Sequence, residues 1–416
     1  MHCGLDFGTS NSTLGTALPG RPARLLPLED GRPTIPSAIF FSFEDSETYY
    51  GRRAQREYTA GTDGRFMRAL KSILGTALIE ENIRIRKDVI PFAEIVGMFV
   101  GELKRRAEAD LADGLDHVVA GRPVHFVDDD PVADRRAQQQ LEAAIRGQGF
   151  RHIEFQFEPI AAALDYESRI NGEELGLVID LGGGTSDFSV VRVSPERVAA
   201  ADRQGDILAA GGIHIGGTDF DRLLSMARAM PELGYRTLTA DGKRPLPSGP
   251  YYDLASWHRI NRLYNAQSLL EQRQTRREAA HPERVDRMIS VIEHREGHRL
   301  AGAVEDAKIA LTDTEAAEIR FAGEEVRLDL PVTRSQLANA LEASIERIAR
   351  TVEATLRDAG LTPRHIETLI LTGGSTRIPA IMARLRMLFP EAKFVETDPF
   401  GSVGLGLAID ARRKFG

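Results

Sequence analysis

The sequence predicts an α/β protein made of two similar halves, each with a glycine-rich turn after a buried strand. The main observation is a repeat, GLDFGTSNST at residues 4–13 and LGLVIDLGGGTSD at residues 175–187. Both copies run from an apolar stretch into aspartate, an apolar residue, glycine and a hydroxyl side chain. A third apolar stretch, LILTGGSTRIP at residues 369–379, also ends in glycines and hydroxyls. One such turn could be an ordinary β-hairpin, but the recurrence favours two related halves.

The composition is that of an ordinary globular protein and argues against several classes of protein, including nucleic-acid binders and membrane-spanning proteins. The chain has 416 residues, 42% hydrophobic and 27% charged, which is long enough for two or more domains. A net charge of −8 argues against electrostatic nucleic-acid binding. No apolar run approaches the ~20 residues that span a bilayer, and no signal peptide is evident. Cys3 is the only cysteine, so no intrachain disulfide is possible, and a cytoplasmic location is expected.

The residue types of the first turn suit a phosphate chain. Gly8 lets backbone N–H groups approach phosphate oxygens. Thr9, Ser10 and Asn11 add side-chain donors. Asp6 would repel phosphate unless a cation lay between them. Mg²⁺ fits this requirement, because it keeps several waters and needs few carboxylates beside a phosphate chain.

The second turn repeats the same chemistry, with an aspartate at the end of its strand. Asp180 corresponds to Asp6, and the glycines that follow it are Gly182, Gly183 and Gly184, before the hydroxyl of Thr185. The two turns are therefore interpreted as the two sides of a nucleotide site.

The third turn adds a candidate for contact with a base. Gly373 and Gly374 permit close approach of the backbone to a ligand, and Arg377 could stack its flat guanidinium on a base. Without the preceding glycines, Arg377 would be interpreted as a surface arginine.

Several segments in chain order extend this pattern over nearly the whole chain. They are GLDFGTSNS, RPTIPSAIFF (32–41), ALKSILG (69–75), FEPIAAALDY (157–166), VIDLGGGTSDFSV (178–190), HIGGTDFD (214–221), AVEDAKIALT (303–312), GGSTRIP and TDPFGSVGLGLAI (397–409). Together they resemble the nucleotide-binding domain of the Hsp70 chaperone family, within the actin and sugar-kinase superfamily. The segments at 69–75 and 214–221, with GGSTRIP, point to the Hsp70 branch.

The resemblance implies an actin-like ATPase (ribonuclease H-like) fold. Two lobes would each have a core α/β subdomain and a smaller peripheral subdomain around a nucleotide cleft. Lobe I would comprise residues 1–170, with its peripheral insertion at about 36–94. Lobe II would comprise residues 171–416, with an expanded insertion at about 222–335.

The catalytic set that the resemblance implies is Asp6, Lys71, Glu158, Asp180 and Thr185. Asp6, Glu158 and Asp180 would organise Mg²⁺ through waters. Asp187 would join the metal site and help to hold K⁺. Lys71 would act as a point charge beside the γ-phosphate, and Thr185 would contact that phosphate or the attacking water. By themselves, Lys71 would be a solvated helix lysine and Glu158 would simply separate a strand from a helix.

The nucleotide contacts that the resemblance implies are Gly8, Thr9, Ser10, Asn11, Gly182, Gly183, Gly184, Thr185, Gly216, Gly217, Glu305, Lys308, Thr312, Gly373, Gly374, Ser375, Arg377 and Asp398. Glu305, Lys308 and Thr312 share one helix face by spacing. Such a face is usually solvated, but the resemblance directs it to ribose and adenine. Ile309 stands where the family usually has an arginine, so the base would rest between Arg377 and an apolar side chain.

Two regions depart from the family pattern. The span from Thr218 to Glu305 is longer than its counterpart and is a candidate docking surface for a co-chaperone or client protein. Its Tyr251, Tyr252 and Trp257 could anchor a partner or form a local core. The C-terminal segment contains no apolar linker and no β-rich peptide-binding domain, so the chain resembles short bacterial Hsp70-related proteins without that domain.

The function expected from the resemblance is slow Mg²⁺-dependent hydrolysis of ATP to ADP, used as a chaperone-related nucleotide switch. Two alternatives stay open. One is a non-catalytic nucleotide-binding scaffold. The other is an actin-superfamily small-molecule kinase, against which the chain shows no distinct substrate-pocket signature.

Overall fold

The computed structural model describes every residue except 128–129, 168, 199, 201, 397 and 399–400. Part of the predicted segment 397–409 therefore lies outside the described residues. The chain forms two compact units. Unit 1 comprises Met1–Ile213, Thr351–Thr376 and Phe389–Gly416, and unit 2 comprises His214–Arg350 and Arg377–Leu388. The predicted lobes, 1–170 and 171–416, divide the chain differently and stay a prediction.

The first sheet of unit 1 is built around the N-terminal strand. Its strands are β1 (His2–Phe7), β2 (Asn11–Thr16), β3 (Arg24–Leu25), β4 (Thr34–Pro36), β10 (His117–Arg122) and β11 (His152–Phe157). The order is β11-β10-β1-β2-β3, and β4 also pairs with β2. The strands β1, β10 and β11 are parallel, whereas β1, β2 and β3 form an antiparallel meander.

The second sheet of unit 1 repeats this topology. Its strands are β12 (Glu174–Leu181), β13 (Ser186–Val193), β14 (Ile207–Ile213), β17 (Thr368–Thr372) and β18 (Lys393–Glu396). The order is β14-β13-β12-β17-β18. Here too a three-stranded antiparallel meander continues into two parallel strands. The prediction of two similar α/β halves is confirmed, because both sheets have the same order of antiparallel and parallel pairings.

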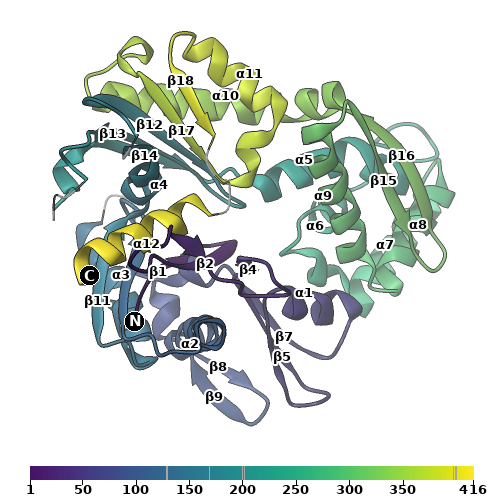
Figure 1. Cartoon of the computed structure of the whole chain (residues 1–416). Coiled ribbons are helices and arrows are strands. Elements are labelled where there is room, and N and C mark those ends of the chain that lie inside the picture. The colour runs from purple at the N-terminus through teal and green to yellow at the C-terminus, as the bar shows by residue number, and fades with distance from the viewer. Residues whose placement is uncertain (128–129, 168, 199, 201, 397, 399–400) are drawn as a thin grey trace. The chain divides into compact units, whose positions relative to one another are not determined.

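Two helices lie between these sheets (Figure 1). They are α4 (Glu158–Glu167), which follows β11, and α12 (Ser402–Phe415), which follows β18. The helices approach closely at Gly406, where a Cβ would lie 1.9 Å from the carbonyl oxygen of Ala161. Buried side chains of α4, α12, β10, β12 and β17 form one apolar cluster. The cluster fixes α4, and with it Glu158, to both sheets.

Unit 1 also contains elements outside these two sheets. It contains β5 (Ala38–Ser42), β6 (Thr48–Tyr50), α1 (Gly51–Ala60), β7 (Gly64–Arg68), the 3₁₀ turns η1 (Leu70–Ile73) and η2 (Ala77–Glu80), β8 (Asn82–Ile85), β9 (Asp88–Pro91), α2 (Phe92–Leu111), α3 (Pro131–Gly147), η3 (Gln204–Asp206) and η6 (Pro363–His365). Asp130 caps the N-terminus of helix α3. Its carboxylate accepts hydrogen bonds from the backbone N–H groups of Val132 (3.0 Å) and Ala133 (2.9 Å), and Pro131 occupies the first turn.

Unit 2 is mostly helical, with one β-hairpin. Its elements are α5 (Gly217–Arg228), η4 (Met230–Leu233), α6 (Gly249–Ala255), η5 (Ile260–Leu263), α7 (Ala266–Glu278), α8 (Pro282–Glu293), α9 (Gly297–Asp313), β15 (Ala316–Ala322), β16 (Arg327–Thr333) and α11 (Pro379–Leu388). Helix α10 (Arg334–Asp358) and the turn η7 (Gly374–Arg377) begin in one unit and end in the other. Leu300, Val304, Ala307 and Leu311 form a buried stripe on α9, as the 3.6-residue period of a helix requires.

The expanded span contains a small apolar core of its own. Leu246, Ala279, Val285 and Ile289 form a buried cluster. Tyr251 is buried, and the half-buried Trp257 packs edge-on against His298, with 4.8 Å between the ring centroids. Tyr251 and Trp257 thus contribute to local packing, whereas Tyr252 is exposed.

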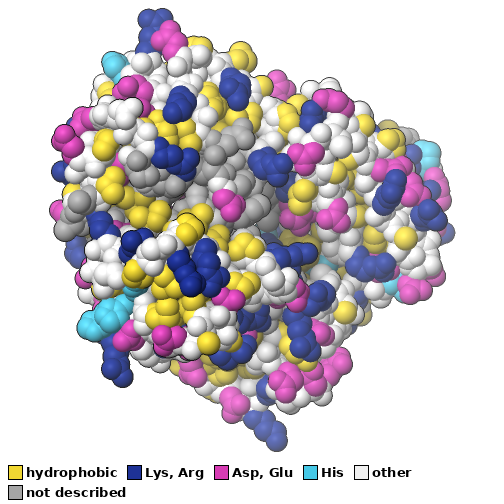
Figure 2. All heavy atoms as spheres, in the orientation of Figure 1, with side chains coloured by type: hydrophobic (Ala, Val, Ile, Leu, Met, Phe, Trp, Pro, Cys, Tyr) yellow, Lys and Arg dark blue, Asp and Glu magenta, His cyan; other side chains and the backbone are white. Residues whose placement is uncertain are grey.

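The visible surface mixes both signs of charge (Figure 2). Acidic and basic side chains are interspersed on that face without a large area of one sign. Within the part of the chain that the structure describes, none of the helices has the length and apolarity needed to traverse a bilayer.

Candidate functional site

Both repeated turns are tight β-hairpin turns whose first strand carries the aspartate near its end. In the first hairpin, Asp6 on β1 lies opposite Thr13 on β2. In the second, Asp180 on β12 lies opposite Asp187 on β13. The second turn closes with the Gly182 N–H donating to the Thr185 carbonyl at 2.9 Å. Each of these turns can therefore close a β-hairpin and also bind a ligand.

The three glycine-rich turns meet within unit 1. A Cβ on Gly183 would lie 2.3 Å from the hydroxyl oxygen of Ser10, so the first and second turns approach as closely as a glycine permits. Gly373, with φ +82°, brings its backbone next to Asp180, where a Cβ would lie 2.6 Å from a carboxylate oxygen. Segments from three distant parts of the sequence thus bring together the residues that the repeat singled out.

Lys71 and Glu158 form an ion pair beside these turns. Lys71 lies on η1, and its ammonium contacts the Oε1 atom of Glu158, the first residue of α4. Their side chains are 10% and 17% exposed, so Lys71 is not a solvated helix lysine. Burial acts to lower the pKa of Lys71, but the carboxylates of Glu158 and Asp6 outweigh it and raise that pKa above its usual range. The lysine keeps its positive charge at neutral pH.

The aspartates of the two hairpins are crowded by negative charge. Burial and the neighbouring Glu158 raise the pKa of Asp6 to about 7, against the opposing effect of Lys71. Burial, together with Asp187, Glu158 and Asp6, raises the pKa of Asp180 to about 8. The site therefore has more carboxylates than one lysine can compensate, an environment that favours a bound cation.

The residues present fit a hydrated Mg²⁺ better than a directly ligated ion. Among the described residues, no three His, Cys, Asp or Glu side chains are close enough to hold a metal between them. Mg²⁺ usually keeps several waters, so Asp6, Glu158 and Asp180 could bind it through water. Asp187 is exposed, and its Oδ2 accepts a hydrogen bond from the Thr185 hydroxyl at 3.0 Å.

The predicted polar face of α9 in unit 2 is only partly solvated. Lys308 is buried, with its ammonium 2.6 Å from Asp221 on α5 and 3.3 Å from the Gly217 carbonyl oxygen. Glu305 is exposed. The Thr312 hydroxyl donates to the Ile309 carbonyl at 2.7 Å. Lys308 is thus covered by α5, whereas Glu305 stays exposed, and the assignment of this face to ribose and adenine stays a prediction.

Two residues predicted to contact the base are exposed in unit 2. Ile309 is 53% exposed. The Arg377 guanidinium is held 2.9 Å from Asp313, one turn beyond Ile309 on α9. Asp313 was not among the predicted residues, although its spacing of four from Ile309 places it on the same helix face.

The remaining predicted residues lie at the starts of helices and turns. Gly216 and Gly217 are buried at the beginning of α5, where the Gly216 N–H donates to the Asp219 carboxylate at 3.1 Å. Ser375 is buried on η7. Asp398 is exposed, and its carbonyl accepts from the Ser402 N–H at 3.1 Å where α12 begins.

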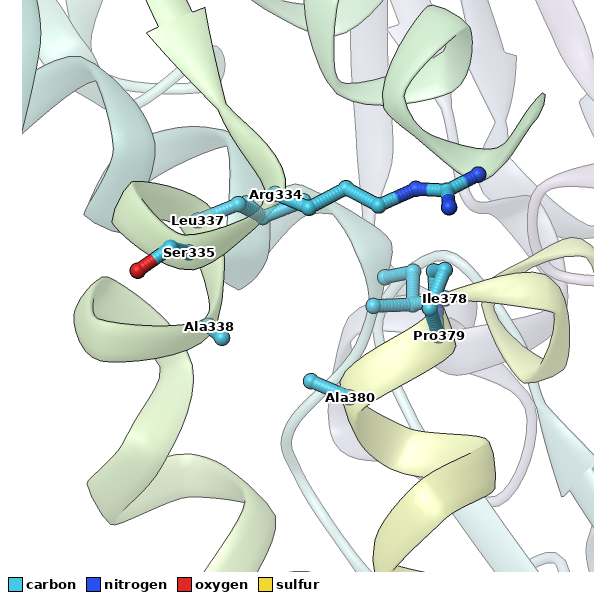
Figure 3. A pocket seen from close by; sticks show the side chains of 7 residues that line it. All are labelled: Arg334, Ser335, Leu337, Ala338, Ile378, Pro379 and Ala380. Carbon is cyan, nitrogen blue, oxygen red and sulfur yellow. The ribbon is translucent and has the colours of Figure 1, made fainter. Parts of the chain in front are cut away.

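An apolar pocket of about 190 Å³ opens in unit 2 (Figure 3). It is lined by Arg334, Ser335, Leu337, Ala338, Ile378, Pro379 and Ala380, at the starts of α10 and α11. The Arg334 guanidinium extends out of it, donating to the carbonyls of Leu311 and Thr312 at 2.8 Å each. No predicted site residue lines the pocket, although Arg334 contacts Thr312 and Ile378 follows Arg377 in the chain.

Comparison with known families decides the affiliation. The family model described as Hsp70 protein matches residues 84–229 and 278–414. The chain belongs to the Hsp70 family. The interruption of the match, residues 230–277, falls inside the expanded span between Thr218 and Glu305. Membership of the Hsp70 family confirms the predicted actin-like fold class.

Similar curated proteins are chaperones of the same family. The chaperone protein DnaK of Thermosipho melanesiensis is 28% identical over 415 residues, covering 98% of this chain and 58% of its own length. DnaK of Thermotoga maritima is 26% identical, with the same coverage. The chaperone protein HscA of Pectobacterium carotovorum is 26% identical, covering 99% of this chain and 58% of its own. This Hsp70-family chain thus spans 58% of the length of these relatives.

Proposed function

We propose that this Hsp70-family protein binds ATP with Mg²⁺, hydrolyses it slowly to ADP, and acts as a nucleotide switch. The observation that carries the proposal is the Lys71–Glu158 ion pair, buried beside the hairpin aspartates Asp6 and Asp180. A phosphate chain would bring the negative charge that Lys71 and a cation can balance, and the glycine-rich turns would supply N–H donors.

Each side chain would have a separate role in hydrolysis. Asp6, Glu158 and Asp180 would hold hydrated Mg²⁺, which neutralises charge on the phosphates. Lys71 would stabilise the negative charge on the transferred phosphoryl group. Thr185, whose hydroxyl already donates to Asp187, would orient the γ-phosphate or the attacking water. Loss of one such charge-stabilising group typically lowers kcat by about 10²–10³-fold.

The family resemblance assigns recognition of the nucleotide base to Ile309 and Arg377. The exposed side chain of Ile309 offers an apolar surface, and Arg377, held by Asp313, offers a flat cation. Asp187 would help to hold K⁺. The assignments of Ile309 and Arg377 rest on the family resemblance and on the Arg377–Asp313 contact, and that of Asp187 rests on the resemblance alone.

A chaperone-related role is the second part of the proposal. DnaK and HscA are chaperone proteins, and a co-chaperone or client would bind this chain through the expanded span 218–305. The protein would act in the cytoplasm. The nucleotide state would be the signal that such a partner reads.

The test is phosphate release from Mg-ATP by the wild-type protein and by Asp180→Asn, with nucleotide binding followed by thermal shift. Glu142→Gln, which alters a solvent-exposed carboxylate paired with Arg146, is the matched control. Slow release that Asp180→Asn abolishes and the control retains would support hydrolysis. Nucleotide binding without release would favour the scaffold alternative. Absence of both would refute the proposed function.

A further inference from the structure

Helix α3 contacts the segment that carries Lys71. Four residues after Lys71, the Gly75 N–H donates to the side-chain oxygen of Gln140 on α3 at 2.8 Å. Gly75 has φ +77°, and a Cβ there would lie 3.0 Å from the Ala133 carbonyl oxygen and 3.1 Å from the Ala137 methyl group. A glycine is therefore required for the Lys71 segment to lie this close to α3.

The same helix also contacts the strand end that precedes Glu158. Arg122, the last residue of β10, is paired in register with Phe157, the residue before Glu158. The Arg122 guanidinium lies 5.1 Å from the centre of the Phe157 ring. It also donates to two side chains on α3, to Asp134 at 2.8 Å and to Gln138. Arg122 thus ties the end of β11 to the first two turns of α3.

The Arg122–Asp134 pair is shielded from water and fully engaged. The two side chains are 14% and 13% exposed. Arg122 also donates to the carbonyls of Pro123 and Val124, at 3.1 Å each. The second carboxylate oxygen of Asp134 accepts from the Phe126 N–H at 2.6 Å. A charge pair with this many partners holds one geometry, whereas an exposed pair would be free to change partners.

The Glu158 side chain also lies beside this strand end. A Cβ on Gly121, the residue before Arg122, would lie 3.2 Å from Cγ of Glu158 and 3.5 Å from its Oε1 atom. Glycine at position 121 therefore lets the end of β10 lie close to the carboxylate that pairs with Lys71.

We propose that residues 133–140 of α3 are the platform that sets the separation of Lys71 and Glu158. In this role Arg122 and Asp134 position Glu158, and Gln140 positions the Lys71 segment. The two members of the pair are 87 residues apart in sequence, and α3 contacts both of their segments. Arg122, Asp134 and Gln140 are positioning residues, because none of them contacts the pair itself. The expected change in kcat rests on the proposed ATPase function, whereas the expected change in the Lys71–Glu158 ion pair does not.

The test compares Asp134→Asn and Gln140→Met with Glu142→Gln, an exposed position on the same helix. Steady-state hydrolysis of Mg-ATP gives kcat and KM. Acetylation of Lys71 by acetic anhydride at one fixed pH, without nucleotide, is quantified by mass spectrometry. In each platform variant kcat is expected to fall about tenfold with KM changed less than twofold. The extent of Lys71 acetylation is expected to rise at least threefold in these two variants. Glu142→Gln is expected to match the wild type in both kcat and acetylation.

The two readouts separate failure of this proposal from failure of the proposed function. If the wild-type protein does not hydrolyse ATP, the ATPase assignment fails, and the extent of Lys71 acetylation alone tests the platform proposal. Unchanged Lys71 acetylation in both platform variants would overturn the platform proposal. If Asp134→Asn does not fold, Gln140→Met decides alone, since its half-buried side chain makes few demands on the core.

Discussion

Replacing Asp180 by asparagine should make the nucleotide-free protein less sensitive to rising pH. Burial and the neighbouring carboxylates raise the pKa of Asp180 to about 8 in the folded state, against roughly 3.9 when unfolded. The folded state therefore holds the proton more tightly than the unfolded state. Consequently the contribution of Asp180 to the free energy of unfolding falls as the pH rises from about 4 to about 8. Asparagine does not titrate and removes this contribution.

The magnitude follows from the single-site linkage relation. Between pH 6 and pH 8, a carboxyl group with a folded pKa of about 8 loses roughly 2 kcal/mol of stabilisation. Asp180 is only half-buried by exposed area, so solvent screening reduces this to about 1 kcal/mol. For a unit of this size, that free energy corresponds to about 2–4 °C in Tm.

The assay is thermal unfolding at pH 6, 7 and 8 without nucleotide or metal. The Tm of the wild type should fall by about 2–4 °C more than that of Asp180→Asn over this range. Glu142→Gln, altered at an exposed carboxylate, should follow the wild type. Parallel pH curves for the wild type and Asp180→Asn would refute the argument that crowded, buried carboxylates raise the pKa of Asp180.

Two further predictions concern packing and buried charge in unit 1. Gly406→Ala should destabilise the protein by at least ~3 kcal/mol, because its Cβ would lie 1.9 Å from the Ala161 carbonyl oxygen. Gly302→Ala is the matched control, because no atom lies within 4 Å of the new Cβ, and it should stabilise the protein by about 0.5–1 kcal/mol. Equal urea midpoints for Gly406→Ala and Gly302→Ala would contradict the steric argument. Arg203→Met should cost about 3–5 kcal/mol by urea unfolding, because it removes the cation that pairs with the buried carboxylate of Glu167, whereas Asp206 keeps its pair with Arg197. A loss below 1 kcal/mol would show that the buried triad contributes little.

The repeated turns could be predicted from the sequence because their chemistry is local. An apolar run ending in aspartate and glycine specifies a buried strand followed by a tight turn, and residues 175–187 form such a hairpin. The same repeat predicted two similar α/β halves, and the two sheets do share one topology. The apolar stripe of α9 was predictable for a similar reason, from its 3.6-residue period.

The partners of charged side chains could not be predicted in this way. Spacing places Lys308 on a polar face of α9, yet Asp221 from another helix covers it. The contacts of Arg122 with α3 likewise depend on how β10, β11 and α3 pack. Helical periodicity reports which side of a helix is apolar, but it does not report which neighbouring element covers the edge of that side.

The sequence by itself determined the two halves, the three glycine-rich turns and the aspartates near the ends of the first two strands. These features depend on residue type and short-range spacing, which act before any long-range contact forms. Only the tertiary structure decided that Lys71 pairs with Glu158, that Lys308 is buried, and that α3 supports both segments of the ion pair. Such contacts join residues far apart in the chain, and their geometry follows from the packing of whole elements against one another.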